Sequence, residues 1–317
     1  MSKRLISVIV PTRDRPDTLR QALASIRSLE GDDITFEILV GDNGRDPETK
    51  KVASDFSAIH IPVSEKGAAA ARNAGLKAAT GEFFAFLDDD DVWLPTHVRQ
   101  HLEIFDKHPD VEAVLAQVIP IDNDMRELDE PWPVRAPTAP DALVKSMLSG
   151  YYPQIGATIV RTSVRNAIGL FDLALLGDQD WDWQLRVARR RKVMYLKLPC
   201  VLFRQRPPGS YDALRFRRLG FARRVFLRHA LPEWRVWGSL NGITNSYRDV
   251  VWQYYEYFVD AAVTRAEAGE PGALRAIFGA IRVFPFRAAF HLIAPKPLRK
   301  ALLTSLFSHR PARPASL

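Results

Sequence analysis

The chain has 317 residues, of which 47% are hydrophobic and 26% are charged, so it can bury a large core and is not disordered. Its single cysteine, Cys200, excludes an internal disulfide framework and fits a reducing compartment. No stretch reaches the roughly 18 uncharged apolar residues that a membrane-spanning helix needs. These totals predict a globular cytoplasmic protein that does not cross a bilayer.

Charge divides the chain into two parts. Residues 211–317 carry 17 Lys or Arg and 7 Asp or Glu, a formal net charge of +10, whereas residues 1–210 carry 27 and 30, a net charge of −3. Beyond residue 210 the sequence also becomes rich in Arg and aromatic residues. We predict an α/β domain over 1–210 and a basic helical extension over 211–317.

The N-terminal part begins with a strand and a helix. "LISVIVP" (5–11) is apolar and rich in β-branched residues, as buried strands are. The residues after it carry leucine and isoleucine at the spacing of one helix face. Pro16 suits the first turn of this helix, and we expect Asp14 to cap it.

Strands and helices then alternate along the chain. We expect strands at 36–43, 58–63 and 82–88, with an Ala-rich helix over 67–81. This order predicts a Rossmann-like, mostly parallel sheet with helices on both faces. Ligands of such sheets bind beyond the carboxyl ends of the strands. Residues 11–13, Asp42 and the acidic run at 88–91 all fall at such ends.

The run "FLDDDDVWLP" (86–95) places four carboxylates beside an apolar strand. Like charges about 4 Å apart repel by roughly 1 kcal/mol in water and about 4 kcal/mol at a partly buried site. Carboxylate oxygens suit Mg²⁺ or Mn²⁺, which typically add substrate phosphates to one or two protein carboxylates. The alternative is a solvated acidic loop. A calcium-storage loop is disfavoured, because no Gly-containing loop with alternating oxygen ligands surrounds the run.

Five segments occur in the order and at roughly the spacing of a known family: "VIVPTRDRPDTLRQALASI", "ILVGDNG", "GAAAARNAGLKAATGEFFAFLDDDDVWLP", "GATIVRTSVRNAIGLFD" and "DQDWDWQLRVA". Over about residues 4–210 the chain resembles inverting family 2 glycosyltransferases, which have the GT-A fold. The resemblance implies transfer of a sugar from a nucleotide-diphosphate donor, UDP- or dTDP-linked, to a hydroxyl of a glycan or lipid-linked acceptor. It also implies a place in polysaccharide assembly at the cell envelope.

The resemblance assigns binding roles residue by residue. Asp90 and Asp91 would hold a divalent cation, Mn²⁺ or Mg²⁺, whereas Asp89 fills the variable position of the signature and has no assigned role. The residues implied in donor binding are Pro11, Thr12, Arg13, Asp42, Arg72, Asn73, Asp88, Asp90 and Arg206. An alternative for Arg72 is a surface arginine that pairs with Glu65 or Glu82.

The resemblance assigns the general base to Asp180 in "DQDWDW", because a carboxylate within reach of the acceptor hydroxyl can remove its proton. The alternative is an acidic residue favoured by a helix N-terminus. Two positions depart from the family pattern. Gln179 stands where a Glu is usual, and Arg206 stands where a His often completes the metal site, so strict metal dependence stays open.

The basic C-terminal part interleaves Arg or Lys with Phe, Leu and Ile at 215–229 and 274–300. On helices this pattern suits attachment to an anionic membrane surface, here the inner face of the cell membrane. It equally suits helices that pack on the catalytic domain with basic outer faces. No nucleic-acid motif is evident, so we do not expect a nucleic-acid partner.

Two other functions are weighed against glycosyl transfer. A nucleotidyltransferase shares a parallel sheet and metal-binding carboxylates, but it usually carries an early Gly-rich phosphate loop, which "VPTRDRP" lacks. A non-catalytic relative that binds nucleotide or membrane is the second alternative, and Gln179 and Arg206 are the positions that favour it.

Overall fold

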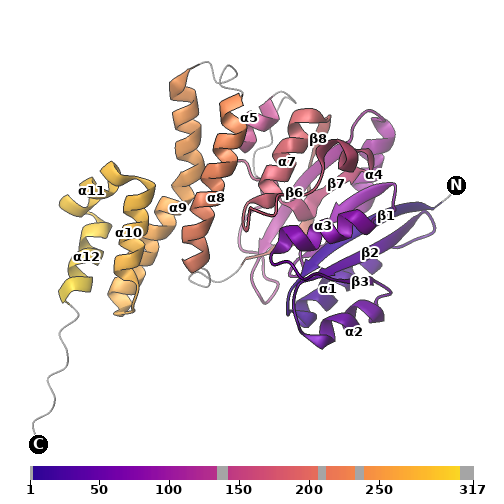
Figure 1. Ribbon diagram of the computed structural model, residues 1–317, viewed down its shortest axis with the longest axis horizontal. Helices are drawn as coiled ribbons and strands as arrows, with labels where there is room; N and C mark the ends of the chain where they lie inside the picture. The colour runs from indigo at the N-terminus through magenta and orange to yellow at the C-terminus, as the bar shows by residue number, and fades with distance from the viewer. Residues whose placement is uncertain (1–2, 134–141, 206–211, 233–238, 308–317) are drawn as a thin grey trace, which may run out of the picture. The chain divides into compact units, whose positions relative to one another are not determined.

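The computed structural model describes residues 3–133, 142–205, 212–232 and 239–307. The chain forms two compact units, Met1–Pro207 and Pro208–Leu317. The first unit holds the sheet and its helices, and the second is helical (Figure 1).

An eight-stranded sheet is the framework of the first unit, in the order β3-β2-β1-β4-β7-β6-β8-β5. Parallel pairs join β3, β2, β1 and β4, and β6 with β8, whereas β7 and β5 pair antiparallel with their neighbours. The strands are β1 (Arg4–Thr12), β2 (Ile34–Asp42), β3 (Ile59–Pro62), β4 (Phe83–Phe86), β5 (Val92–Trp93), β6 (Ala113–Ile121), β7 (Thr158–Arg161) and β8 (Val193–Arg204).

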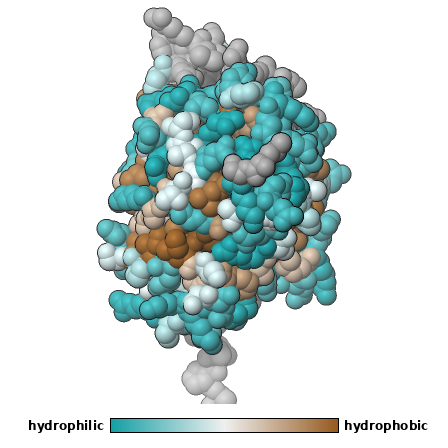
Figure 2. Space-filling model, turned by 90° about the vertical axis from the view of Figure 1, so that its right-hand side faces the viewer, coloured by the Kyte–Doolittle hydropathy of each residue, from teal (hydrophilic) through white to brown (hydrophobic). Residues whose placement is uncertain are grey.

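Helices flank this sheet (Figure 1). They are α1 (Pro16–Arg27), α2 (Pro47–Asp55), α3 (Ala68–Ala78), α4 (His97–Lys107), α5 (Leu143–Met147), α6 (Ser163–Ile168) and α7 (Gln179–Arg190), with a 3₁₀ turn, η2, at Ile155–Ala157. The predicted α/β class, a Rossmann-like sheet flanked by helices, is confirmed. The face of the molecule shown in Figure 2 is mostly hydrophilic, with smaller apolar areas between the hydrophilic ones.

Strand β1 is apolar on both faces and does not alternate between apolar and polar residues, as its place in the core explains. Ile6, Val8, Ile9 and Val10 are fully buried, because helices cover both faces of the parallel half of the sheet. The same close packing brings α3 against β1 and β2. At Gly41 an added Cβ would lie 2.4 Å from the Ala71 carbonyl oxygen, so only glycine permits this approach beside Asp42.

The predicted capping role of Asp14 is wrong. The residue before α1 is Arg15, which makes no side-chain cap. The Asp14 carboxylate instead accepts hydrogen bonds from the backbone N–H groups of Arg45 (2.6 Å) and Asp46 (3.0 Å). Asp14 has a positive φ of 53°, which turns it away from the helix. It therefore ties the loop after β1 to the loop after β2.

The second unit contains α8 (Asp212–Ala230), α9 (Leu240–Ala268), α10 (Ala273–Val283), α11 (Pro285–Ile293) and α12 (Pro297–Phe307). The long helix α9 packs against α8, α10 and α12 (Figure 1). Among the described segments, no helix combines the length and apolar character that crossing a membrane requires.

Candidate active site

Three predicted site segments meet at one edge of the sheet. In the parallel register of β1 and β2, Pro11 pairs with Gly41 and Thr12 with Asp42. Strand β4 pairs with β1 up to Phe86 opposite Ile9, so the acidic run that follows β4 emerges beside the end of β1. Arg13 lies just beyond Thr12, and its side chain is exposed.

Asp89, to which the resemblance assigns no binding role, is a buried anchor of this edge. Its carboxylate accepts hydrogen bonds from Thr12 Oγ1 (2.7 Å) and Arg15 Nη1 (3.1 Å). Burial, with the neighbouring Asp90 charge, raises the pKa of Asp89 to about 6. Arg15 also donates to Asp90 Oδ2 (3.0 Å), so one guanidinium neutralises two of the four acids.

Asp91 is held by Arg204, which ends β8 in the other half of the sheet. Asp91 Oδ1 accepts the Arg204 backbone N–H (2.9 Å), and Arg204 Nε donates to the carbonyl oxygen of Asp90 (2.9 Å). Burial and the charges of Asp88 and Asp90 raise the pKa of Asp91 well above its ordinary value. The acidic run is therefore built into the core and is not a solvated loop.

Arg72 is the cation beneath Asp88. Its side chain is only 2% exposed, and Nη2 donates a short hydrogen bond to Asp88 Oδ1. This excludes the alternative of a surface arginine paired with Glu65 or Glu82. Arg72 Nε and Nη1 are buried and have no hydrogen-bond partner among the described residues. Burial raises the pKa of Asp88 and Arg72 lowers it, with a net rise.

Asp42 is nearly buried at the end of β2. Its Oδ1 accepts the Gly44 backbone N–H (2.8 Å), and its Oδ2 lies 3.0 Å from His60 Nε2 of β3. These two contacts fix the carboxylate beside Thr12, where the resemblance places the nucleotide base.

Asn73 connects α3 to the segment that leads to Asp180. Its amide nitrogen donates to the Phe171 carbonyl oxygen (3.0 Å), and its amide oxygen accepts the Phe171 N–H (2.8 Å). The Phe171 ring stacks on Trp183 of α7, with centroids 5.2 Å apart. Asn73 therefore positions a loop here, a role different from the predicted contact with the donor.

Asp180 lies in the first turn of α7, and its Oδ1 accepts the Trp181 backbone N–H (2.9 Å). The charge of Asp180 raises the pKa values of both Arg72 and Asp88, after the larger effects of burial and of the Arg72–Asp88 pair. The structure thus brings Asp180 into electrostatic range of the acidic run. Asp182, two residues further along α7, is fully buried and pairs with Arg186 (3.0 Å).

The carboxylates of the acidic run fit a divalent cation. Oxygen donors are the ligands that Mg²⁺ and Mn²⁺ take. Burial is the main cause of the raised pKa values of Asp88 and Asp91, and the charges of neighbouring aspartates add to it, so a cation would stabilise the ionised carboxylates. The carboxylates of Asp90 and Asp91 also have backbone or Arg15 partners that fix their orientation. Arg206, the remaining predicted donor contact, lies outside the described residues.

Across the described ranges, three potential metal-ligand atoms converge within 4.8 Å only at His97, His101 and Cys200. All three are buried, and His97 packs on Trp93 and His101 with centroids 4.4 and 4.5 Å apart. Burial lowers the pKa values of both imidazoles, so they are neutral aromatic members of the core.

We expect these histidines to make the fold sensitive to acid. Burial lowers the pKa of His101 to about 4, below the unfolded value of about 6.5, so the unfolded chain binds the proton first. This contribution is complete above about pH 6.5 and is lost towards pH 4, by about 3 kcal/mol. Urea unfolding at several pH values should give a flatter profile for His101→Gln, whereas the exposed His108→Gln should match the wild type. Equal slopes in all three proteins would refute the assignment.

Residues 7–152 match the family model described as Glycosyl transferase family 2. The chain carries a family 2 glycosyltransferase domain. The enzyme is also 32% identical over 112 residues to the Escherichia coli protein named UDP-Glc:alpha-D-GlcNAc-diphosphoundecaprenol beta-1,3-glucosyltransferase WfgD. That match covers 34% of this chain and 44% of WfgD.

Solved structures agree with the fold of the glycosyltransferase. Staphylococcus aureus TarS 1–349 superimposes with a TM-score of 0.59 at 19% identity, covering 96% of this chain and 88% of that chain. The mannosyltransferase PcManGT from Pyrobaculum calidifontis, solved with GDP-Man and Mn²⁺, gives a TM-score of 0.54 at 18% identity and covers 98% and 89%. At this identity the likeness establishes the fold alone.

Proposed function

We propose that the enzyme transfers a sugar from a nucleotide-diphosphate donor to an acceptor hydroxyl with inversion. The observation that carries the proposal is the placement of Asp180 in electrostatic range of Arg72 and Asp88. This electrostatic effect supports a site shared by the first turn of α7 and the acidic run that follows β4. The family match supports glycosyl transfer over the nucleotidyltransferase alternative.

Asp180 is the proposed general base. It lies in the first turn of α7, which follows the loop that Asn73 binds at Phe171. The hydrogen bond from α3 and the Phe171–Trp183 stack therefore help to fix its position. The Asp180 carboxylate takes the proton of the acceptor hydroxyl as that oxygen attacks the sugar carbon from the face opposite the leaving diphosphate. A single displacement of this kind inverts the configuration at the sugar carbon.

Asp90 and Asp91 would hold the divalent cation, Mn²⁺ or Mg²⁺. When bound, that cation neutralises the charge of the leaving diphosphate. Thr12, Asp42 and Asp88 bind the nucleoside in this proposal, and Arg15 and Arg204 hold the acidic run in place. Pro11 and Arg13 border the nucleoside at the end of β1.

The relatives support the donor and acceptor classes. The name of WfgD specifies a UDP-glucose donor and a diphosphoundecaprenol-linked acceptor, and TarS 1–349 is known in complexes with UDP and with UDP-GlcNAc. We therefore propose a UDP- or dTDP-linked donor and a glycan or lipid-linked acceptor of the cell envelope. The enzyme would act in the cytoplasm as a peripheral protein on the inner membrane face.

Nucleotide binding tests the donor site. Titration calorimetry with UDP, dTDP and GDP, with and without Mn²⁺, should show one nucleotide whose binding Mn²⁺ strengthens. We expect the Asp90→Ala, Asp91→Ala variant to lose at least about ten-fold in affinity, or about 1.4 kcal/mol. The matched control, Asp124→Ala with Asp129→Ala, removes two exposed acids after β6 and should bind as the wild type does. Binding that neither Mn²⁺ nor the site variant changes would contradict the assignment.

A further inference from the structure

Helix α11 exposes an apolar face. Phe286, Phe290 and Ile293 are 91%, 60% and 77% exposed, and their spacing places them on one side of the helix. Ala288, on the other side, is fully buried within the unit. Large apolar side chains at such exposure are unusual when they are contiguous, and they mark interaction surfaces.

Helix α10 has the same two-sided character. Gly279 and Ala280 are buried, and an added Cβ at Gly279 would lie 2.6 Å from the Phe258 ring of α9. Leu274 and Phe278, one turn apart, are both more than half exposed. The inner faces of these helices are thus buried by packing within the unit, whereas the described residues leave the outer apolar faces exposed.

The segment that forms these faces carries charge of one sign. Residues 271–317 contain eight Lys or Arg and no Asp or Glu. Arg275 and Arg282 of α10 are exposed, as are Lys296, Arg299 and Lys300 at the start of α12. Cations beside an exposed apolar face are the pattern of helices that lie in the interface of an anionic bilayer.

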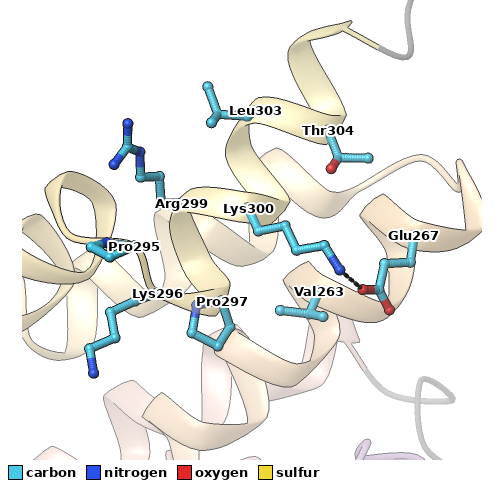
Figure 3. A pocket seen from close by; sticks show the side chains of 9 residues that line it. All are labelled: Val263, Glu267, Pro295, Lys296, Pro297, Arg299, Lys300, Leu303 and Thr304. Carbon is cyan, nitrogen blue, oxygen red and sulfur yellow. Dashed lines mark hydrogen bonds and ion pairs between the residues drawn. The ribbon is translucent and has the colours of Figure 1, made fainter.

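A basic pocket lies next to this face. It has a volume of about 660 Å³. Lys296, Arg299 and Lys300 line it together with the apolar Pro297, Val263 and Leu303 (Figure 3). Lys300 Nζ pairs with Glu267 (2.7 Å), whereas Lys296 and Arg299 are exposed and make no ion pair with a described acidic residue. Such a pocket suits the phosphate group of a lipid headgroup.

We propose that α10 and α11 dock the enzyme on an anionic lipid bilayer, which rests on the peripheral attachment proposed above and names its surface. Phe286, Phe290 and Ile293 insert at the level of the headgroups, and the pocket at Lys296 and Arg299 receives lipid phosphate. A second copy of the chain is a poorer occupant, because it would bring the same positive charge to the contact. Attraction of this kind weakens as salt rises.

Vesicle co-sedimentation tests the proposal on the full chain. We expect binding to phosphatidylcholine vesicles with about 30% phosphatidylglycerol, and much weaker binding to phosphatidylcholine alone. Phe286→Ser with Phe290→Ser should reduce binding at least about ten-fold, and Lys296→Glu with Arg299→Glu should reduce it and remove most of its salt dependence. The control is Leu240→Ser, because Leu240 is 82% exposed but begins α9 about 35 Å along that helix from Val263 of the pocket.

Two outcomes would overturn this assignment. One is equal binding by the wild type and the Phe286, Phe290 variant. The other is light scattering that shows a dimer for the wild type and a monomer for the same variant, which would make the face a contact between two copies of the chain. Calorimetry with the soluble nucleotide separates this proposal from the transfer reaction. The surface variants should bind nucleotide with wild-type affinity, so a loss of vesicle binding in them reports on the surface and not on the active site.

Discussion

Asp180→Asn should reduce the rate of sugar transfer by about 10²–10⁴-fold, because it removes the only group assigned to take the acceptor proton. The amide is nearly isosteric and keeps an oxygen to accept the Trp181 N–H, so the start of α7 should stay in place. The measurement is the transfer rate with a UDP-sugar and a glycan or lipid-linked acceptor, together with nucleotide affinity. We expect the affinity to stay within a few-fold of the wild type.

The control for this experiment is Asp124→Asn, an exposed acid in the loop after β6, which should transfer sugar at the wild-type rate. A pH profile adds a second readout, since the acid limb of the rate that reports the base should vanish in Asp180→Asn. If the Asp180 variant transfers sugar at the normal rate, Asp180 is only a helix N-terminal acid and the non-catalytic alternative for this position holds.

The parallel half of the sheet could be predicted from sequence because its strands are short, mostly apolar runs rich in β-branched or aromatic residues. β1, β2, β3 and β4 all occur within a residue or two of the expected ranges. Strand β8 was not predicted, since "VMYLKLPCVLFR" includes a proline and pairs with a register shift at Gln117. Its pairing with β6 joins residues about 80 apart, which local pattern does not encode.

The acidic run was recognised, but the cations that hold it were not. Arg15 binds the carboxylates of Asp89 and Asp90, and Arg204 binds the backbone carbonyl of Asp90. The two arginines lie near opposite ends of the domain's sequence. The letters "TRDRP" and "LFRQRP" contain them beside equally plausible arginines, and only the fold decides which ones turn inward. The structural role of Asp89 is hidden for the same reason: the position is variable in the signature, yet here Thr12 and Arg15 enclose its carboxylate.

Arg72→Met should weaken nucleotide binding at least about ten-fold while changing stability little. The loss of the ion pair with Asp88 is offset, because two buried Arg72 nitrogens without partners are removed as well. Arg72 is covered by the fold and pairs with Asp88, so we expect it to act on the donor through Asp88, as a positioning residue. A loss of several kcal/mol in urea unfolding, with unchanged nucleotide affinity, would show a purely structural ion pair.

A pH titration of nucleotide binding separates these cases further. Arg72 lowers the pKa of Asp88 against the opposing effect of burial, so its removal must raise that pKa. If Asp88 binds the nucleotide as a carboxylate, the acid limb of binding should move to higher pH in Arg72→Met. Arg72→Lys keeps the charge but not the fork geometry, so its acid limb should lie between the other two. An acid limb that is the same in all three proteins would mean that Asp88 does not titrate with donor binding, and the link between the buried arginine and the donor would fail.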